Sequence, residues 1–408
     1  MSTIMSFIGI ASLILIGFLC SENRTSINFR TVLLALSIQI ALGAFVMYVP
    51  IGMSIIEYLS HGVNDIIAFS NAGLKFVFGD LANFKVGFIF VINVLCVVIF
   101  VSALISVLYY LKIMQLVINT IGGALSKILG TSKAESLSAT ANIFVGPIEA
   151  PSMVRPLVKN MTRSELFAVM TGGLASVAGG TMVGYINLGI DPKYILTACF
   201  MTAPAGLLFA KLMCPQTEHD LVKNQIDINS AEKPKGLLEA ISDGSTMGMN
   251  QVIIVTALLI SFVALIALLN GIIGSLGNLV GIDALTLEGI IGYLLAPLTF
   301  LMGVPWSEAV TAGSIIGQKI AVNEFVAYIN YLDIASQMSE KTQAIVVFSL
   351  CGFANIGSLA MVVGGISAMC PDKRDLIASI GPRVLLASIL ANLMSGTIAG
   401  ALISVGSL

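Results

Sequence analysis

The sequence predicts an all-α integral membrane protein with eight transmembrane helices, two re-entrant helical hairpins, interfacial helices and inverted repeats. Of its 408 residues, 57% are hydrophobic and 10% are charged, whereas soluble domains carry about 25% charged residues. Runs of about 20 apolar residues also recur, each long enough to cross a hydrocarbon core of about 30 Å. These two observations exclude a soluble class. A third, carboxylates inside interrupted apolar segments, indicates the hairpins.

Eight apolar segments have the length of a transmembrane helix. In chain order they are residues 4–20, 31–50, 86–110, 165–187, 194–213, 250–273, 343–369 and 383–406. The first has no basic leader and no small-residue cleavage site, so we interpret it as a retained span rather than a signal peptide.

Two further segments are amphipathic, which is typical of helices that lie flat in the membrane interface. Residues 54–70 place an apolar stripe opposite Glu57, His61 and Asp65, and residues 112–129 carry a similar stripe. Because the chain offers no soluble domain to receive these stripes, we expect both segments to be interfacial helices.

Two other segments are apolar but contain helix-breaking polar residues. Residues 134–160 contain Glu149 followed by Ala150 and Pro151, and residues 307–337 contain Asn323 and Glu324. Neither half of either segment is long enough to span a membrane alone. They are therefore predicted to be re-entrant hairpins, whose non-helical tips are tolerated only inside protein or beside a water-filled cavity.

The distribution of basic residues predicts the orientation. If the N-terminus is outside, fifteen of the 20 Lys and Arg residues fall in cytoplasmic regions, and Lys319 is among the five left outside. Both termini are then external to a bacterial inner membrane, and residues 216–235 form a cytoplasmic loop between the halves. The two hairpins enter from opposite sides, so the repeats are inverted.

These features divide the chain into four parts. Residues 1–132 are expected to be mainly scaffold, comprising spans 1–3 and interfacial helices, and residues 133–215 to hold the first hairpin and transport repeat. Residues 216–306 are expected to hold the cytoplasmic loop, a sixth span belonging to the scaffold and an interfacial segment. Residues 307–408 are expected to hold the second hairpin and transport repeat.

Two stretches roughly 180 residues apart repeat each other, at 173–179 and 352–358. Each places glycine and a polar residue inside an apolar span. Small and polar residues at corresponding points of two membrane halves indicate the binding site of a transporter. Ser and Gly also mediate close helix packing in membranes, so the match between the two stretches carries this inference rather than either stretch alone.

Glu149 and Glu324 are the leading candidates for contact with a solute. Placing a charge at mid-bilayer costs about 2.5–3.5 kcal/mol of insertion free energy, so each carboxylate is expected to have a bonding partner or a functional role. They are expected to accept hydrogen bonds from hydroxyls of a polar solute or to help hold a coupling cation. The alternative is that each is solvated at a hairpin mouth or caps backbone amides.

A sodium site is expected where unwound backbone offers carbonyl oxygens. The candidates come from the first hairpin tip and the first break: Asn142, Val145, Ser176 and Val177. The motifs of redox, metal-dependent and hydrolytic sites do not occur in the sequence. The six cysteines form no CxxC pair, there are only two histidines, and neither HExxH nor G-x-S-x-G occurs, so neither an enzyme nor a histidine-based metal site is indicated. A net charge of -2 without a basic block argues against a nucleic-acid partner.

Several motifs together resemble the concentrative nucleoside transporters, over essentially the whole chain. They are the stretch NIFVGPIEAP at 142–151, MTRSELFAVM at 161–170, GQK at 317–319, NEFVAY at 323–328 and CGFAN at 351–355. The resemblance implies a homotrimer, in which each subunit carries a scaffold domain and a mobile transport domain. It also implies a nucleoside substrate, a surrounding of membrane lipid and sodium as the coupling ion.

The resemblance also assigns roles to individual residues. It implies that the ribose of the nucleoside is bound by Glu324, Asn355 and Ser358, with Phe353 lining the pocket. It implies sodium ligation, largely through backbone carbonyls, by Asn142, Val145, Ser176 and Val177. Gln318 and Asn323 are expected to support the second hairpin.

The chain departs from the family in the first hairpin. The family usually reads Gly-Gln-Thr-Glu-Ala-Pro, where Gln and Thr bind the nucleobase, but here Pro147 and Ile148 precede Glu149. Thr181, where a small apolar residue is common, is expected to compensate in part. Since hydrogen-bonding sites discriminate more sharply than apolar ones, base selectivity is predicted to be altered while sugar binding is intact. Alternatively, Glu149 still reads the base, directly or through water.

The resulting prediction is a sodium-coupled secondary active symporter that imports nucleosides by moving a transport domain, without covalent chemistry. Two alternatives of the same class stay open: proton coupling through Glu149 or Glu324, and transport of a different ribosyl or modified nucleoside. A nucleoside-gated channel or sensor and a membrane-embedded enzyme are the alternatives from other classes.

Overall fold

The computed structural model describes residues 2–83, 87, 89–147, 150, 158, 160–218, 236–279, 281 and 285–406. Within these ranges the regular elements are helices, and no strand occurs, which confirms the all-α prediction. The first half contains α1 (Ser2–Leu19), α2 (Phe29–Tyr48), α3 (Pro50–Phe78), α4 (Val97–Tyr110), α5 (Ile113–Leu129), α6 (Lys133–Ala141), α9 (Arg163–Ala175), α10 (Gly179–Leu188) and α11 (Pro192–Met213). The second half contains α12 (Leu237–Leu279), α13 (Leu287–Leu301), α14 (Trp306–Ala321), α15 (Glu324–Ile334), α16 (Glu340–Leu350), α17 (Ile356–Met369) and α18 (Arg374–Gly406).

Six of the predicted spans lie, apart from a few residues at their ends, within helical segments long and apolar enough to cross a membrane. These segments, found among the described residues, are 29–48, 91–110, 163–188, 192–213, 237–279 and 371–406. The other two predicted spans differ: residues 4–19 form a shorter apolar helix, and the span at 343–369 is broken between α16 and α17. The total of eight therefore stays a prediction.

Both segments predicted to be amphipathic are helices, α3 and α5. In α3, Ile56 and Ile67 are buried whereas Ile55 and Leu59 are exposed, so only part of the apolar stripe faces protein. The helices are confirmed, and their place in a membrane interface stays a prediction.

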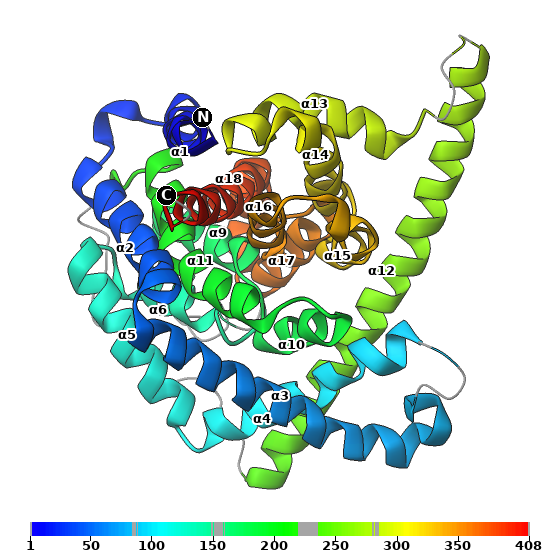
Figure 1. Ribbon diagram of the computed structural model, residues 1–408. Helices are drawn as coiled ribbons and strands as arrows, with labels where there is room; N and C mark the ends of the chain where they lie inside the picture. Colours follow the sequence, from blue (N-terminus) through cyan, green and yellow to red (C-terminus); the bar gives the residue numbers. More distant parts are fainter. Residues whose placement is uncertain are drawn as a thin grey trace.

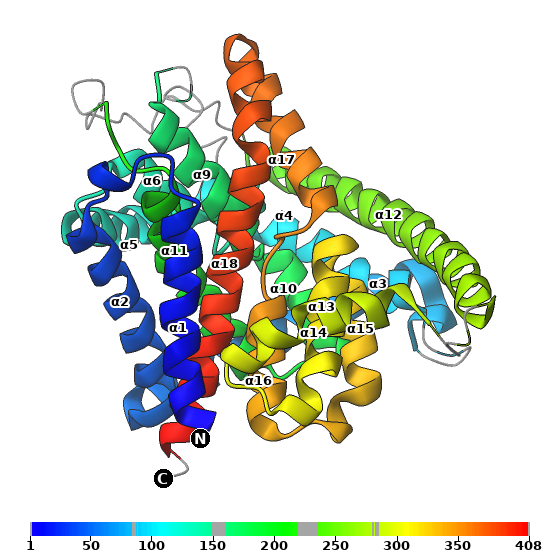
Figure 2. The same cartoon turned by 90° about the horizontal axis from the view of Figure 1, so that it is seen from above.

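The order of elements occurs twice. In the first half, α6 leads into a turn, a broken helix (α9 and α10) and the long α11; in the second, α14 and α15 precede a broken helix (α16 and α17) and the long α18. α9 and α16 lie toward opposite ends of the molecule in Figure 2, as expected for inverted repeats. The segment predicted to be the second hairpin, 307–337, corresponds to α14, a break and α15, and α13 meets α14 at 118°. That this segment re-enters the membrane stays a prediction. Most of the return arm of the first hairpin, residues 151–157 and 159, lies outside the described residues.

Helix starts explain why the first repeat folds where it does. Ser132 and Glu135 form a reciprocal capping box at the start of α6, and Thr162 and Glu165 form another at the start of α9. Each box satisfies amide groups that the first turn leaves without partners. α10 ends at Leu188 and is capped by Gly189, whose φ of 111° is the left-handed conformation that favours glycine.

The core of the fold is a bundle in which α18 is central. α18 packs against α1, α9, α11 and α16, and α2 packs against α11 (Figure 1). α12, by contrast, runs along one side of the molecule, and only 6% of its apolar window is buried. It packs on α4 through Gly244 and Gly248, where an added Cβ would come within 2.7 and 2.6 Å of the α4 backbone. Both chain ends lie at the same end of the molecule (Figure 2).

Candidate functional site

The two breaks that repeat in the sequence meet in space. α9 ends at Ala175 and α10 begins at Gly179, whereas α16 ends at Leu350 and α17 begins at Ile356. The amide of Phe353 donates a hydrogen bond of 3.1 Å to the carbonyl of Ser176, so the two stretches of unwound backbone are directly joined. The structure therefore brings the paired breaks together, as the sequence predicts.

A glycine is required at this junction. Gly352 has a φ of 156°, and a Cβ placed on it would lie 2.5 Å from the carbonyl oxygen of Ala175. Any side chain would push the two breaks apart. The glycine of the second repeat stretch therefore serves close backbone approach.

Glu324 lies at the junction and is buried. It begins α15, directly after Asn323, whose side chain accepts a hydrogen bond of 3.0 Å from the amide of Val326. The Glu324 carboxylate accepts one hydrogen bond from the Tyr185 hydroxyl at 2.9 Å and another from the Asn355 amide at 3.0 Å. The start of the helix also favours a negative charge here. Glu324 is thus no solvated carboxylate at a hairpin mouth.

Asn355 is held in one orientation by two partners. Its Nδ2 faces Glu324, and its Oδ1 accepts a hydrogen bond of 2.7 Å from the amide of Ser358. Asn355 is the N-cap of α17, so the break itself places the amide beside the carboxylate. Ser358 and Phe353 are buried in the same region. The four residues assigned to the ribose and its pocket are therefore clustered.

The tip of the first hairpin lies against the first break. The carbonyl of Phe144 accepts a hydrogen bond of 3.0 Å from the amide of Gly179, and the Nδ2 of Asn142 lies 3.6 Å from where a Cβ of Gly172 would be. Asn142 is fully buried, and among the residues that the structure describes neither polar atom of its side chain has a hydrogen-bond partner. Buried polar groups are nearly always paired, so this amide indicates a missing ligand.

The other residues expected at the sodium site come from the same two segments. Ser176 and Val177 are buried in the first break, and Val145 is half-buried at the hairpin tip. The hydroxyl of Ser176 donates to the carbonyl of Gly173 at 3.3 Å. Unwound backbone and an unpaired amide oxygen are the neutral oxygen ligands that a hard cation prefers.

The stretch expected to contact the nucleobase is described only in part. Pro147 is half-buried, and its carbonyl oxygen lies 3.2 Å from where a Cβ of Gly173 would be. Ile148 and Glu149 lie outside the described residues, so their expected contacts stay predictions.

Thr181 is buried and is bonded to a different element. Its hydroxyl accepts a hydrogen bond of 2.8 Å from Gln251 of α12. This bond ties α10, which continues from the first break, to the helix at the side of the molecule. The expected compensation for the missing base contacts therefore stays a prediction, with Gln251 as a competing partner.

Gln318 and Asn323 make contacts that suit a supporting role in the second hairpin. The side-chain oxygen of Gln318 accepts a hydrogen bond of 2.5 Å from Asn330, which joins α14 to α15. Asn323 caps α15 at the break between the two arms. Together they fix the arm that carries Glu324.

Three residues of this site were not found from the sequence. Tyr185 is fully buried, bonds Glu324, and packs its ring 4.8 Å from the ring of Phe325. Lys319 and Asn392 are also buried, and they bond each other at 2.6 Å. The available signal was a polar side chain within an otherwise apolar segment.

The side chain of Lys319, which the sequence-based orientation counts among the basic residues outside, is buried. Its ammonium group is in the protein core, where it also donates to the carbonyl of Ser349 at 2.8 Å. A lysine near a hairpin tip looks like a loop residue in sequence, but the hairpin folds into the bundle. The orientation inferred from basic residues therefore depends on the remaining ones.

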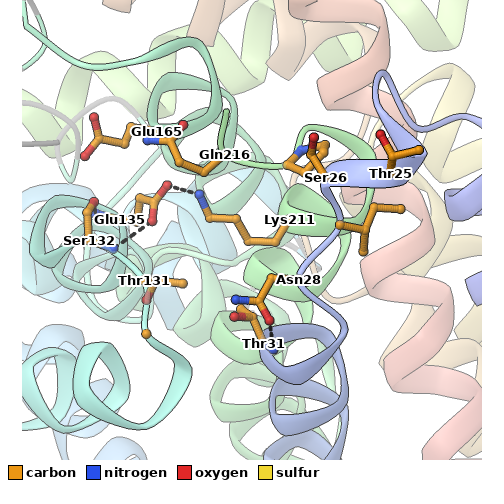
Figure 3. A pocket seen from close by; sticks show the side chains of 13 residues that line it. Thr25, Ser26, Asn28, Thr31, Thr131, Ser132, Glu135, Glu165, Lys211 and Gln216 are labelled. Carbon is orange, nitrogen blue, oxygen red and sulfur yellow. Dashed lines mark hydrogen bonds and ion pairs between the residues drawn. The ribbon is translucent and has the colours of Figure 1, made fainter. Parts of the chain in front are cut away.

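A separate polar cavity of about 520 Å³ lies where α2, α6 and α9 begin (Figure 3). Lys211 projects into it and forms an ion pair with Glu135, and it also donates to Ser164 at 2.9 Å. Glu165 accepts from the amide of Thr162 at 2.9 Å. The charged groups among the described lining residues are thus already paired within the protein.

Comparison with known proteins covers the whole chain. Three family models match: "Na+ dependent nucleoside transporter N-terminus" over residues 8–81, "Nucleoside recognition" over 91–191 and "Na+ dependent nucleoside transporter C-terminus" over 194–400. The chain is 47% identical over 417 residues to the nucleoside permease NupC of Helicobacter pylori, covering 100% of this chain and 99% of that protein. It is 35% identical over 415 residues to the rat sodium/nucleoside cotransporter 2, covering 98% of this chain and 62% of that protein.

Solved structures with the same fold are also similar in sequence. CNTnw in an inward-facing substrate-bound state superposes with a TM-score of 0.94 at 48% identity, covering 100% of this chain and 99% of that one. A variant of CNTnw in an outward-facing state gives a TM-score of 0.96 at 48% identity with the same coverage.

Proposed function

We propose that this chain, which belongs to the family of Na+-dependent nucleoside transporters, imports nucleosides across a bacterial inner membrane as a sodium-coupled secondary active symporter. The resemblance read from the sequence motifs is thereby confirmed at the level of the family, and the protein is a membrane transporter rather than an enzyme. The coupling ion, the transport mechanism and the residue roles are our proposals.

The buried carboxylate of Glu324 is the observation that carries the proposal. An ionised carboxylate offers about four acceptor sites, and Tyr185 and Asn355 occupy two of them. The remaining capacity suits the hydroxyls of a ribose, whose bonds to a charged acceptor are strong. Ser358 and Phe353 would then complete a sugar pocket at the second break.

The unpaired amide of Asn142 supports sodium as the coupling ion. A sodium ion would be held by the side-chain oxygen of Asn142 and by backbone carbonyls of Val145, Ser176 and Val177. Because the Ser176 carbonyl also accepts from Phe353, the proposed ion and sugar sites share a direct main-chain contact. Through this contact, sodium binding at Ser176 would also fix the position of Phe353 in the nucleoside site.

Packing supports a moving transport unit. The bundle around α18 holds both breaks, whereas α12 and α4 pack mainly on each other at one side. The sequence-based expectation assigns residues 1–132 mainly to the scaffold. We instead propose that α1 and α2 belong with the bundle, since they contact α18 and α11, and that α4 and α12 belong to the scaffold. The exposed apolar side chains of α12 suit contact with lipid and with neighbouring subunits of a homotrimer. CNTnw, in both inward- and outward-facing states, superposes well on this chain, which supports alternating access.

Uptake into proteoliposomes tests the coupling ion. With an inward sodium gradient we expect labelled uridine to accumulate above its external concentration, and we expect no accumulation when choline replaces sodium. Uptake that persists in choline and grows with an inward proton gradient would instead support proton coupling. Equilibration without accumulation in either gradient would indicate a channel.

A competition panel tests the substrate. Purine, pyrimidine and base-modified nucleosides should compete with labelled uridine over a narrow range of affinities, because Pro147 and Ile148 offer no side-chain hydrogen bonds to a base. 2'- and 3'-Deoxynucleosides should compete poorly, since they lack hydroxyls for Glu324. Failure of every nucleoside to compete would refute the sugar-site assignment.

A further inference from the structure

Asn392 of α18 joins the ends of the two broken helices. Its Nδ2 donates one hydrogen bond to the carbonyl of Ala175 at 2.6 Å and another to the carbonyl of Cys351 at 3.0 Å. Ala175 directly precedes Ser176 of the proposed ion site, and Cys351 lies two residues before Phe353 of the proposed sugar site. One buried amide group therefore holds the backbone at the entrance to both breaks.

Lys319 fixes the orientation of this amide. Its ammonium donates to the Oδ1 of Asn392 at 2.6 Å and to the carbonyl of Ser349 at 2.8 Å. With the oxygen facing the ammonium, both N–H groups of Asn392 must face the two carbonyls. Lys319 lies on the same hairpin as Glu324, so the network connects three parts of the proposed site. Buried hydrogen-bond networks of this kind favour one arrangement, because each bond left unmade in the interior is costly.

Close packing leaves this network little freedom. The Cβ that a residue other than glycine would have at position 352 would lie 2.5 Å from both polar atoms of the Asn392 side chain. At Gly396, one turn further along α18, an added Cβ would meet the Ser349 hydroxyl of α16 at 2.1 Å. α18 therefore packs tightly against α16 and the second break. Because Asn392 is bonded to both breaks, a shift of one break changes the hydrogen bonds of the other.

We propose that Asn392 is a positioning residue that couples sodium binding to nucleoside binding, an inference that depends on the proposed sodium symport. A sodium ion that orders the carbonyls of Ser176 and Val177 also fixes the end of α9. Through Asn392 the same ordering reaches Cys351 and the turn that presents Phe353. Binding of either ligand then favours the other, since coupling between sites is reciprocal. The main-chain bond between Phe353 and Ser176 is a second route, so loss of Asn392 weakens the coupling without abolishing it.

The test compares Asn392→Asp with the control Ser388→Ala. Asp keeps the size and the bond to Lys319 but presents oxygen to the two carbonyls, so both donated bonds are lost. Ser388 lies one turn earlier on α18 and donates to the carbonyl of Thr171 of α9 at 3.2 Å, so its loss disturbs the same helix pair away from the breaks.

The measurement is the ratio of the uridine Kd without sodium to the Kd at saturating sodium, on the purified full-length protein. Wild type and Ser388→Ala are expected to share one ratio, within the roughly 5–150-fold typical of coupled sites. In Asn392→Asp the ratio is expected to fall by about threefold or more, with uridine still bound in the absence of sodium.

Each outcome decides between distinct conclusions. An unchanged ratio in Asn392→Asp, even with lower thermal stability, would show a structural role and overturn the inference. If Asn392→Asp does not fold, Asn392→Ser and Lys319→Met disrupt the same network more mildly, and a wild-type ratio in both would overturn it. A wild-type protein whose uridine affinity does not depend on sodium would refute sodium symport and this inference together. A wild-type protein with a sodium effect, combined with an undiminished ratio in the variant, would refute the inference alone.

Discussion

The two halves of the molecule contain the same kind of helix break but surround it with different polar side chains. The first break lies against the tip of the first hairpin, which carries the fully buried Asn142, a side chain without a hydrogen-bond partner among the described residues. The second break lies against the start of α15, where the carboxylate of Glu324 is already bound by two donors. Neutral oxygens suit a cation, whereas a charged acceptor suits hydroxyl groups. Under the proposed roles, the repeated backbone feature therefore does not repeat its function. The side chains that neighbouring helices supply decide what each break binds.

The largest effect is expected from removing the charge of Glu324, which lies against the second break. Glu324→Gln should lower uridine uptake by tenfold to hundredfold, because a hydrogen bond to a charged group contributes about 1.5–3 kcal/mol. The measurement is initial uptake in proteoliposomes at matched protein content. Glu288→Gln is the control, since Glu288 is a carboxylate bound by Asn270 on α12, outside the breaks. Normal uptake by Glu324→Gln would remove this residue from the site.

At the first break, Asn142→Ala should weaken the binding of sodium rather than the binding of the nucleoside. The sodium concentration for half-maximal uptake should rise about tenfold, which corresponds to about 1.4 kcal/mol. Ser138→Ala is a matched control, because Ser138 is also buried on α6 with an unpaired hydroxyl one turn earlier. An equal sodium shift in both variants would mean that α6 had been perturbed generally.

Substitution of Tyr185 tests whether the hydrogen bonds that Glu324 accepts contribute as much to nucleoside uptake as its charge does. Tyr185→Phe removes one of two donors to the carboxylate, so we expect the KM for uridine to rise severalfold, by less than in Glu324→Gln. Tyr328→Phe is the control, since its hydroxyl donates to the carbonyl of Val347 at 3.0 Å and packs in the same ring cluster. A larger effect of Tyr328→Phe would indicate that the packing of the ring cluster controls the site.

The smallest expected effect concerns an ionic contact between the repeats outside the membrane. Hydrogen bonding to Arg163 of α9, with a further contribution from Arg383 of α18, lowers the pKa of Glu22 from 4.5 to about 2. A lowered pKa means that the carboxylate stabilises the fold above pH 4.5 and loses this contribution as the pH falls toward 2.

Glu22→Gln should accordingly lower the thermal unfolding temperature at pH 7 by a small amount, since both arginines are partly exposed. The difference from wild type should shrink as the pH falls below 4.5. Glu57→Gln, which removes an exposed pair with Lys193, should change the unfolding temperature little at any pH. A constant difference for Glu22→Gln across this pH range would exclude the ionic contact as its cause.

The site was predictable where its features are local. Asn323 and Asn355 cap helices that start one residue later, so their break-forming role follows from neighbouring sequence. The partners of Glu324 were only half predictable, because Asn355 lies in the repeated stretch whereas Tyr185 lies 139 residues away without a repeated motif. Thr181 shows the same limit, since its bond to Gln251 depends on how α10 meets α12.

The sequence by itself determined the membrane class, the helical fold and the positions of both breaks. Apolar length and interrupting glycine and polar residues are local properties, and backbone in a membrane must satisfy its hydrogen bonds within helices or inside protein. Only the tertiary structure decided that Lys319 lies in the core and that Asn392 links both breaks. Burial and hydrogen-bond partners depend on contacts between residues far apart in the chain, which no local pattern encodes.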